Sequence, residues 1–263
     1  MPRKFFKMQG CGNDYLFFDC RKEGIDDPNK LSVRLSDRRF GVGGDGIVLL
    51  LPSEVADAKM RIFNADGSEG AICGTALRCI GKILFDEKEQ ACYTVETNAG
   101  VRRVCAVSKD VFSVDMGKAD FSPRSIPSLF PSEAVDMPFM GYRITCLSMG
   151  NPHAVIFDEP TGFPLQEVAE KIAGSGYFPQ GVNVEVCKAE GEIRARVYER
   201  GSGETLSCGS GACAVANAAY ATGRAGKDVS VRFPGGVVQI KLTEYGALLI
   251  GGAVKVFTGE ITI

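Results

Sequence analysis

The sequence predicts a mixed α+β protein built from two pseudo-symmetric domains, each rich in antiparallel strands. Three observations support this prediction. The chain repeats itself at an offset of about 135 residues, a helical pattern follows the same point in each repeat, and short apolar runs typical of strands surround both helices. We expect an N-terminal half over 1–115, to which a final strand at about 252–263 returns, and a C-terminal half over 116–251. Two such domains would face each other across a cleft, which suits a reaction that needs matched groups on two faces of a substrate.

The internal repeat is clearest around two Cys-Gly pairs. Residues 63–76 align with residues 198–211 at an offset of 135, so that Cys73 falls on Cys208. The other matched positions are Phe63 with Tyr198, Glu69 with Glu204, Gly74 with Gly209, and the glycine turns at 95–101 and 231–237. A duplicated unit of about 130 residues therefore predicts two domains of one architecture.

The expected elements follow from hydrophobic periodicity and from glycine and proline positions. Helices are expected at 27–35, 76–85, 165–173 and 212–222. Strands are expected at 61–63, 91–97, 101–107, 143–148, 182–187, 193–198, 229–233 and 237–242. The proline-containing stretch 115–139 is expected to join the two halves.

The composition argues against several classes of protein. A net charge of −2 and 9% aromatic residues, not interleaved with basic clusters, argue against binding to nucleic acid or to an anionic membrane. No apolar run resembles a signal peptide or a spanning helix, so we expect a cytoplasmic protein. In that compartment the ten cysteines are expected to be reduced thiols, with Cys105, Cys146 and Cys187 as small core residues. A single histidine and the absence of Cys-x-x-Cys argue against a metal site or a redox site.

Cys73 and Cys208 each stand immediately before a predicted helix. The first N–H groups of a helix are unpaired and carry partial positive charge. A thiol at this position is expected to have its pKa lowered from about 8.5 toward neutrality, so that it can act as a base. The same N–H groups, at Gly74 and Thr75 in one half and at Gly209 and Ser210 in the other, are expected to receive a substrate carboxylate.

A pair of such thiols predicts proton transfer at a carbon next to a carboxylate. One thiolate would remove the Cα proton and the other thiol would protonate the opposite face, with no cofactor required. A single Cys-Gly at a helix start is usually structural, and the matched pair is what favours catalysis. Cys79 and Cys213, which lie inside the following helices, are expected to be buried packing residues.

At these residues the sequence resembles the diaminopimelate epimerase family, whose enzymes interconvert L,L- and meso-diaminopimelate on the route to lysine and peptidoglycan. The resemblance runs from about residue 4 to residue 261. The matching motifs lie, in order, at 7–14, 37–43, 64–69, 150–153, 181–183, 199–211, 233–236 and 257–261. The resemblance implies, in each half, a curled sheet around a central helix.

The resemblance also implies the residues of the site. The two catalytic cysteines fall on Cys73 and Cys208, and the further substrate contacts fall on Asn13, Asn64, Asn151, Asn183, Glu199 and Arg200. The last two would hold the ammonium and carboxylate of the distal amino-acid group together, although an exposed salt bridge between them is the alternative. Each asparagine has the alternative of a turn residue that bonds its own backbone. His153 is expected to support the site as a residue lining the cleft and not to act as the base.

Several alternatives stay open at this point. Thr75 stands where the family usually has asparagine, which bears on the identity of the substrate. A cofactor-independent racemase of another amino acid, such as histidine or glutamate, shares most of these features. A thiol-redox protein or a small-molecule binding protein is a more distant reading. No lysine stands in a phosphate-binding context typical of a pyridoxal enzyme, and by resemblance a homodimer is possible.

Overall fold

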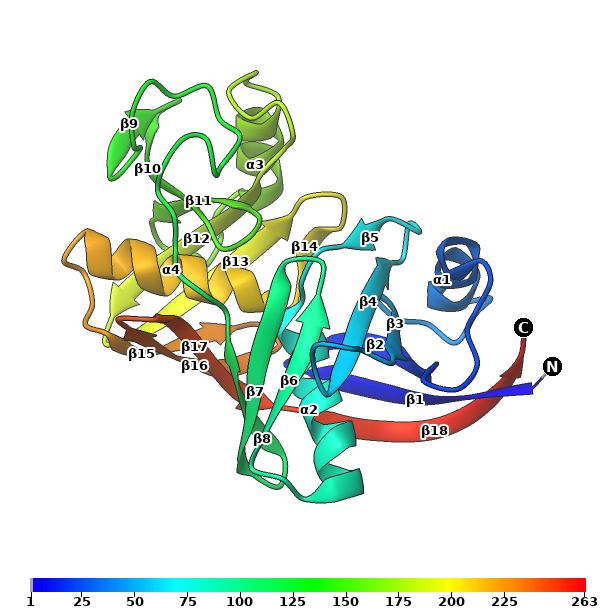
Figure 1. Ribbon diagram of the computed structural model, residues 1–263. Coiled ribbons are helices and arrows are strands. Elements are labelled where there is room, and N and C mark those ends of the chain that lie inside the picture. Colours follow the sequence, from blue (N-terminus) through cyan, green and yellow to red (C-terminus); the bar gives the residue numbers. More distant parts are fainter. Residues whose placement is uncertain (1) are drawn as a thin grey trace. The chain divides into compact units, whose positions relative to one another are not determined.

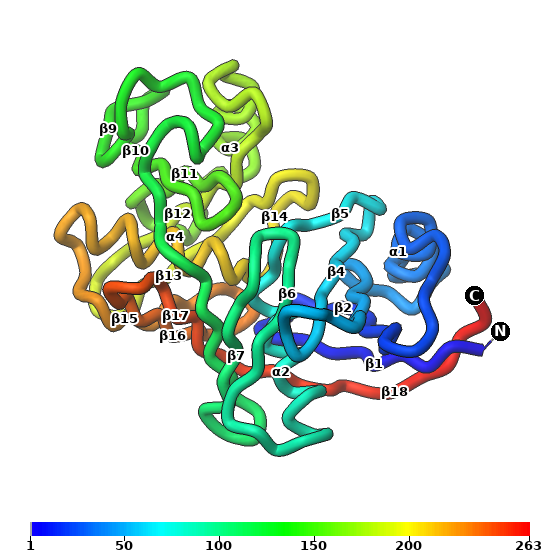
Figure 2. Tube along the Cα trace, in the orientation of Figure 1, coloured from blue at the N-terminus to red at the C-terminus, as the bar shows by residue number. Residues whose placement is uncertain are grey.

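A computed structural model describes residues 2–263 of the chain, which form four α-helices and eighteen β-strands. The predicted mixed α+β class is confirmed. The chain divides into two compact units, the first made of Met1–Asp115 with Gly251–Ile263 and the second of Met116–Ile250. Each unit is described by itself below, and Figures 1 and 2 trace the chain through both.

The first unit holds two helices and nine strands. They are β1 (Pro2–Gly10), β2 (Asn13–Asp19), α1 (Pro28–Ser36), β3 (Gly46–Leu51), β4 (Ala58–Asn64), β5 (Glu69–Gly70), α2 (Gly74–Lys88), β6 (Cys92–Thr97), β7 (Gly100–Ser108), β8 (Val111–Asp115) and β18 (Val254–Thr262). β1 pairs antiparallel with β2, β2 parallel with β3, and β3 antiparallel with β4. β4 pairs antiparallel with β5 and parallel with β6, from which β7 and β8 continue as an antiparallel meander.

The second unit repeats this plan. Its elements are β9 (Met137–Phe139), β10 (Tyr142–Ser148), β11 (Pro152–Phe157), α3 (Leu165–Ala173), β12 (Asn183–Glu190), β13 (Glu192–Glu199), β14 (Gly203–Thr205), α4 (Gly209–Ala221), β15 (Asp228–Phe233), β16 (Gly236–Thr243) and β17 (Gly246–Gly252). The pairings from β10 to β17 reproduce those from β1 to β8, including the parallel pairs β11–β12 and β13–β15. The duplication in the sequence is therefore a duplication of topology.

The helix after each Cys-Gly pair is the central helix of its unit. α2 packs against β1, β6, β7 and β8, and its residues from Gly74 to Leu84 are all buried. α4 packs against β10, β11, β12, β15 and β16, and its small residues, mostly alanine, are buried from Gly211 to Ala216. Each of these helices is buried on nearly every side. Such a helix needs a sheet that curls around it, because exposing its apolar side chains to water would cost free energy.

The final strand returns to the first unit. β18 pairs antiparallel with β1, with Pro2 opposite Thr262, so that the last residues of β18 lie beside the first residues of β1 (Figure 2). Phe5 of β1 packs its ring edge-on against Phe257 of β18 at a centroid distance of 5.9 Å. This contact and the strand pairing tie the end of the chain to its beginning.

The stretch 115–139, which we expected to act as a joining segment, belongs to the second unit. Ile126, Phe130 and Ala134 are buried in the apolar core that also contains Ile144 and Ile172. The segment is irregular, yet its apolar side chains are buried in the core of the second unit. It is thus part of a domain and not only a connection.

The expectation that all ten cysteines are reduced thiols is wrong. Cys92 and Cys105 form a disulfide and lie directly opposite each other on the antiparallel strands β6 and β7. Both are partly exposed, so Cys105 is not the core residue that its apolar neighbours suggested. Cys146 and Cys187, in contrast, are fully buried, as expected.

Candidate active site

Cys73 caps the N-terminus of α2 in the first unit. Its backbone is extended (φ −145°, ψ 118°), and its sulfur accepts a hydrogen bond from the Ala76 amide at 3.4 Å. The sulfur also lies 3.7 Å from Asn13 Oδ1 and 3.8 Å from the Tyr15 hydroxyl. The helix begins at Gly74, two residues before its predicted start, because the thiol itself serves as the cap.

Asn13, a predicted substrate contact, lies beside this thiol and is held by a carboxylate that sequence reasoning missed. Its Nδ2 donates to Asp45 Oδ2 at 2.8 Å, and the same oxygen accepts from the Asp14 amide at 3.0 Å. Burial raises the pKa of Asp45. Asp14 is in turn paired with Lys7 and Arg38. A lone aspartate between two glycines, at 44–46, gave no pattern from which this contact could be predicted.

Thr75, which replaces the family's usual asparagine, is buried in the first turn of α2. Its hydroxyl accepts a hydrogen bond from Nη2 of Arg78 at 3.3 Å. Arg78 is only 1% exposed, and its Nε and Nη1 have no hydrogen-bond partner within residues 2–263. A guanidinium stays charged at all accessible pH values, so the start of α2 carries a buried positive charge in addition to the helix dipole.

Asn64 ends β4 opposite Gly46, the residue after Asp45, and its side chain bonds within its own turn. Its Nδ2 donates to Ser68 Oγ at 3.0 Å, and its amide donates to the Ser68 carbonyl at 2.8 Å. Its side chain therefore bonds the side chain of a turn residue, and not its own backbone as the alternative had it. Its role as a substrate contact stays a prediction.

Cys208 caps the N-terminus of α4 in the second unit, as Cys73 caps α2. Its sulfur accepts from the Gly211 amide at 3.4 Å and lies 3.4 Å from Ser210 Oγ. The negative charge of Glu199 acts on this thiol, and the Glu199 carboxylate accepts a hydrogen bond from Thr205 Oγ1 at 2.5 Å. The predicted capping position at the start of a helix is confirmed for both cysteines.

The prediction that the pKa of such a thiol falls toward neutrality is wrong for Cys208. Burial raises its pKa well above the ordinary value, and the negative charges of Glu199 and Glu185 raise it further. The hydrogen bonds from Ser210 and Gly211 act in the opposite direction but are outweighed. Loss of hydration is a larger effect here than the partial charge of one helix end. Cys208 therefore keeps its proton at neutral pH.

His153 is completely buried. It therefore does not line an open surface, contrary to our expectation. Its Nδ1 lies 2.7 Å from Glu185 Oε1, and its Nε2 lies 3.0 Å from Asn151 Oδ1. Asn151 Nδ2 in turn donates to Ser210 Oγ at 3.3 Å. The only histidine of the chain thus reaches the neighbourhood of Cys208 through Asn151 and Ser210. Sequence reasoning missed Glu185, although a lone acid in the apolar run 182–187 was a visible signal.

Asn183, Glu199 and Arg200 meet at the adjoining ends of β12 and β13. Asn183 Nδ2 donates to the Pro152 carbonyl, and its Oδ1 accepts from the Arg200 amide, both at 2.9 Å. No ion pair joins Glu199 to Arg200 within the described part of the chain, so the alternative of a salt bridge between them is not observed, and their contact with a substrate stays a prediction. Successive residues of a strand point to opposite faces. Glu199 accordingly approaches Cys208, whereas the exposed Arg200 donates through Nη1 to the Gln180 carbonyl at 2.6 Å.

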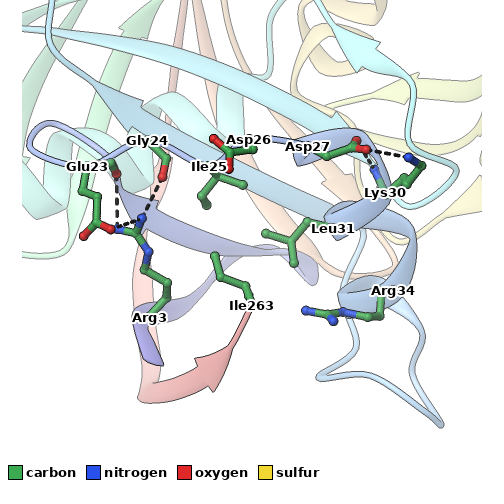
Figure 3. A pocket seen from close by; sticks show the side chains of 10 residues that line it. All are labelled: Arg3, Glu23, Gly24, Ile25, Asp26, Asp27, Lys30, Leu31, Arg34 and Ile263. Carbon is green, nitrogen blue, oxygen red and sulfur yellow. Dashed lines mark hydrogen bonds and ion pairs between the residues drawn. The ribbon is translucent and has the colours of Figure 1, made fainter. Parts of the chain in front are cut away.

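A separate pocket of about 420 Å³ lies in the first unit, away from every predicted site residue (Figure 3). Arg3 on its wall is bound to Glu23 at 2.8 Å, and Lys30 is bound to Asp27 at 2.8 Å. Its charged side chains therefore largely neutralise one another, and it offers no chemistry comparable to the two cysteines. Among residues 2–263, no cluster of three or more potential metal ligands and no helix able to span a membrane is found.

The family model for diaminopimelate epimerase matches residues 5–122 and 145–263, which include both cysteines and the hydrogen-bonded groups around them. The chain belongs to the diaminopimelate epimerase family. It is 43% identical to a diaminopimelate epimerase from Desulfovibrio desulfuricans, over 99% of this chain and 98% of the relative. It is 40% identical to one from Acetivibrio thermocellus, over 99% of both chains.

Solved structures with lower identity share the fold of this family member. A phenazine biosynthesis protein of the PhzF family from Bacillus anthracis superposes with a TM-score of 0.74 at 16% identity, over 100% of both chains. A probable proline racemase from Agrobacterium radiobacter superposes with a TM-score of 0.71 at 17% identity, over 99% of this chain and 93% of the other. These similarities show the two-unit fold alone.

Proposed function

We propose that this chain interconverts L,L- and meso-diaminopimelate by moving the proton on one α-carbon. The observation that carries the proposal is the pair of cysteine-capped helices at equivalent places in the two units, in a chain of the diaminopimelate epimerase family. The reaction class follows from the chemistry of a thiol placed at a helix N-terminus, where a carboxylate also binds well.

The proposed mechanism uses Cys73 and Cys208 as an acid–base pair. One cysteine, as thiolate, takes the Cα proton and becomes a thiol, while the other thiol gives its proton to the opposite face of the carbon and becomes a thiolate. Charge that develops on the substrate carboxylate is stabilised by the free N–H groups at Gly74–Thr75 and Gly209–Ser210. No atom is gained or lost apart from the exchanged proton.

Cys208 is the proposed proton donor of the resting enzyme. Its thiol lies between the Ser210 hydroxyl and the Glu199 carboxylate, and its raised pKa keeps it protonated. Cys73, beside the start of α2 with its buried Arg78 charge, is the proposed base. After one turnover the two roles are exchanged until protons equilibrate with water.

Diaminopimelate is favoured over another amino acid because of the relatives and of Arg200. Relatives named diaminopimelate epimerase share about 40% identity over the whole chain, whereas the probable proline racemase shares 17%. The exposed guanidinium of Arg200 supplies a bidentate site for a distal carboxylate, which proline does not carry.

Deuterium exchange tests the function directly. Reduced protein is incubated in D₂O with L,L-diaminopimelate and, separately, with histidine, glutamate and proline, without added cofactor. Deuterium at Cα of diaminopimelate alone supports the proposal. Exchange on another amino acid alone would keep the thiol chemistry and reject the substrate, and no exchange at all would reject the activity.

We further propose a cytoplasmic homodimer that binds neither nucleic acid nor membrane. Six buried cysteines outside the disulfide, at positions 20, 79, 146, 187, 208 and 213, are typical of a reducing compartment. Val254, Val256 and Phe257 on β18 are each about half exposed, which supports a surface that a second copy covers. Light scattering would detect the dimer, and the Val256→Lys substitution should weaken it. Cell fractionation tests the compartment.

A further inference from the structure

Glu185 is a fully buried carboxylate that has no part in the mechanism above. It lies on β12, with 0% of its surface exposed, and its Oε2 has no hydrogen-bond partner among residues 2–263. Its Oε1 lies 2.7 Å from His153 Nδ1. Burying a carboxylate costs desolvation free energy unless hydrogen bonds or a neighbouring charge compensate it. A carboxylate buried in this way is expected to have a role in the protein.

The carboxylate lies directly behind the turn that holds Cys208. A Cβ atom at Gly211 would come within 2.8 Å of Glu185 Oε1, so this carboxylate packs against the first turn of α4. Gly211 is also the residue whose amide donates to the Cys208 sulfur. The other ionisable groups near this carboxylate are Glu199 and Cys208, together with the buried thiols of Cys146 and Cys187.

A chain of hydrogen bonds connects Glu185 to Cys208, and from His153 onward each group donates to the next. Asn151 Oδ1 can only accept, so His153 Nε2 must carry a proton and donate to it. The contact between Nδ1 and Oε1 then holds one proton, on either atom, and both arrangements leave Nε2 protonated. The imidazole therefore acts as a donor toward Asn151, and Glu185 holds the other ring nitrogen in place.

The same direction of hydrogen bonding continues from Asn151 to the Cys208 sulfur. With its oxygen engaged by His153, Asn151 donates through Nδ2 to Ser210 Oγ at 3.3 Å. The Ser210 hydroxyl, which accepts this bond, is left to donate its own proton to Cys208 Sγ, 3.4 Å away. A hydroxyl that donates to sulfur stabilises the thiolate that forms when Cys208 gives up its proton.

We propose that Glu185 is a positioning residue that holds the His153 ring through Nδ1, so that the Nε2–H group orients Asn151 and Ser210, and Ser210 donates to the Cys208 sulfur. This role rests on the proposed function only for its kinetic consequence. The orientation itself is a property of the resting protein. It can be measured without substrate.

The test uses the fact that the chain has one histidine. In uniformly ¹⁵N-labelled protein, the one imidazole gives one pair of ring nitrogen signals, which report directly which nitrogen carries a proton. We expect a protonated Nε2 in the native protein at neutral pH, because Asn151 Oδ1 can only accept. A bare Nε2 in the native protein would overturn the proposal, whatever the activity.

Two variants separate position from charge. Glu185→Gln can donate to Nδ1 and so keeps Nε2 protonated, and its kcat should stay within a few-fold of the native value. Glu185→Leu removes the partner of Nδ1, so the Nδ1 signal should shift and the Nε2 proton should exchange with water faster. Its kcat should fall by roughly 10- to 100-fold, as expected for one hydrogen bond to a charged group, with a smaller change in KM.

Glu190→Leu, an exposed change on the same strand, is the matched control and should alter neither the spectrum nor kcat. Far-UV circular dichroism identifies any variant that does not fold, in which case the native and Gln spectra still decide. Unchanged imidazole signals in a folded Glu185→Leu variant would reject the positioning role. If native protein shows no epimerase activity but the spectra behave as expected, the proposed function fails while the orientation by Glu185 stands.

Discussion

The Cys208 sulfur accepts a hydrogen bond from the Gly211 amide nitrogen, 3.4 Å away at the first turn of α4. In the other unit the Cys73 sulfur accepts from Ala76 at the same distance. A serine at either position would preserve this cap, since a hydroxyl oxygen is a good N-cap acceptor. What serine cannot do is ionise near neutral pH. The cap and the acid–base function of each cysteine can thus be separated by a single sulfur-to-oxygen change.

Cys73→Ser and Cys208→Ser should each lower epimerisation by at least about 10²-fold, within the range usual for loss of a general acid or base. Thermal unfolding should show a native-like transition, because the helix cap survives. The measurement is the rate of deuterium entry at Cα of diaminopimelate. Cys79→Ala is the control, since Cys79 is fully buried within α2 and should affect stability alone. Near-normal turnover in either serine variant would reject the two-thiol mechanism.

The protonation of Cys208 predicts its chemical reactivity. Because burial, Glu199 and Glu185 raise its pKa, iodoacetamide should label Cys208 slowly at pH 7 and faster as the pH rises above 9. Glu199→Gln removes one of the negative charges and should accelerate labelling at pH 7. Peptide mass spectrometry of quenched samples gives both rates. A labelling rate that is independent of pH, or slower in the Gln variant, contradicts the assignment of Cys208 as the resting acid.

The elements that periodicity could predict are the helices and the strands with clear apolar runs. All four expected helices occur, and α3 spans Leu165–Ala173, the expected range. β3 was not predicted, although residues 46–51 are almost wholly apolar. A strand buried on both faces lacks the alternation that distinguishes a strand from a buried helix.

The site was predictable where its chemistry is local and not where it depends on pairing between distant segments. The capping positions of Cys73 and Cys208 follow from the adjacent helix, and both are confirmed. The disulfide between Cys92 and Cys105 depends on the register of β6 against β7. Glu185 meets His153 only because β11 and β12 lie in parallel, and no spacing in the sequence encodes that contact.

Folding stability should fall at alkaline pH. Burial raises the pKa of Cys79 and of Cys146 to about 12 in the folded protein, whereas an unfolded thiol ionises near about 8.5. Above pH 8.5 the unfolded state therefore loses protons that the folded state keeps. Each such thiol lowers the free energy of unfolding by about 1.4 kcal/mol per pH unit, and the loss continues up to the folded pKa. Urea denaturation between pH 7 and 10 measures the slope.

A Cys79→Ala variant serves as the internal comparison for this slope. It should be less stable than the native protein at pH 7, because it leaves a small cavity in the core. Its stability should nevertheless fall less steeply above pH 8.5, since one buried thiol is missing. Identical slopes for the two proteins would show that Cys79 does not contribute in the way its burial implies.

Arg200→Ala should raise the KM for diaminopimelate by roughly tenfold or more, and should also lower kcat, because remote binding energy helps to orient the reacting carbon. The Arg200 backbone amide that bonds Asn183 is unchanged by the substitution, so the local fold should persist. Arg194→Ala is the matched control, an exposed arginine of β13, the strand that Arg200 follows, and it pairs with Glu159. Equal kinetics in the native protein and in both variants would indicate that the distal group binds elsewhere or that the substrate is different.

The disulfide between Cys92 and Cys105 should stabilise the first unit without taking part in the chemistry. It closes a loop with a sequence separation of 13 residues, for which loop closure predicts about 3 kcal/mol, or roughly 5–10 °C in melting temperature. Reduction with dithiothreitol should lower the melting temperature by that amount, while epimerase activity at 25 °C should persist. A Cys92→Ala/Cys105→Ala variant should melt at the lower temperature with or without reductant. A reductant-dependent shift in that variant would show that another pair of cysteines is responsible, whereas lost activity on reduction would give the β6–β7 hairpin a role in catalysis.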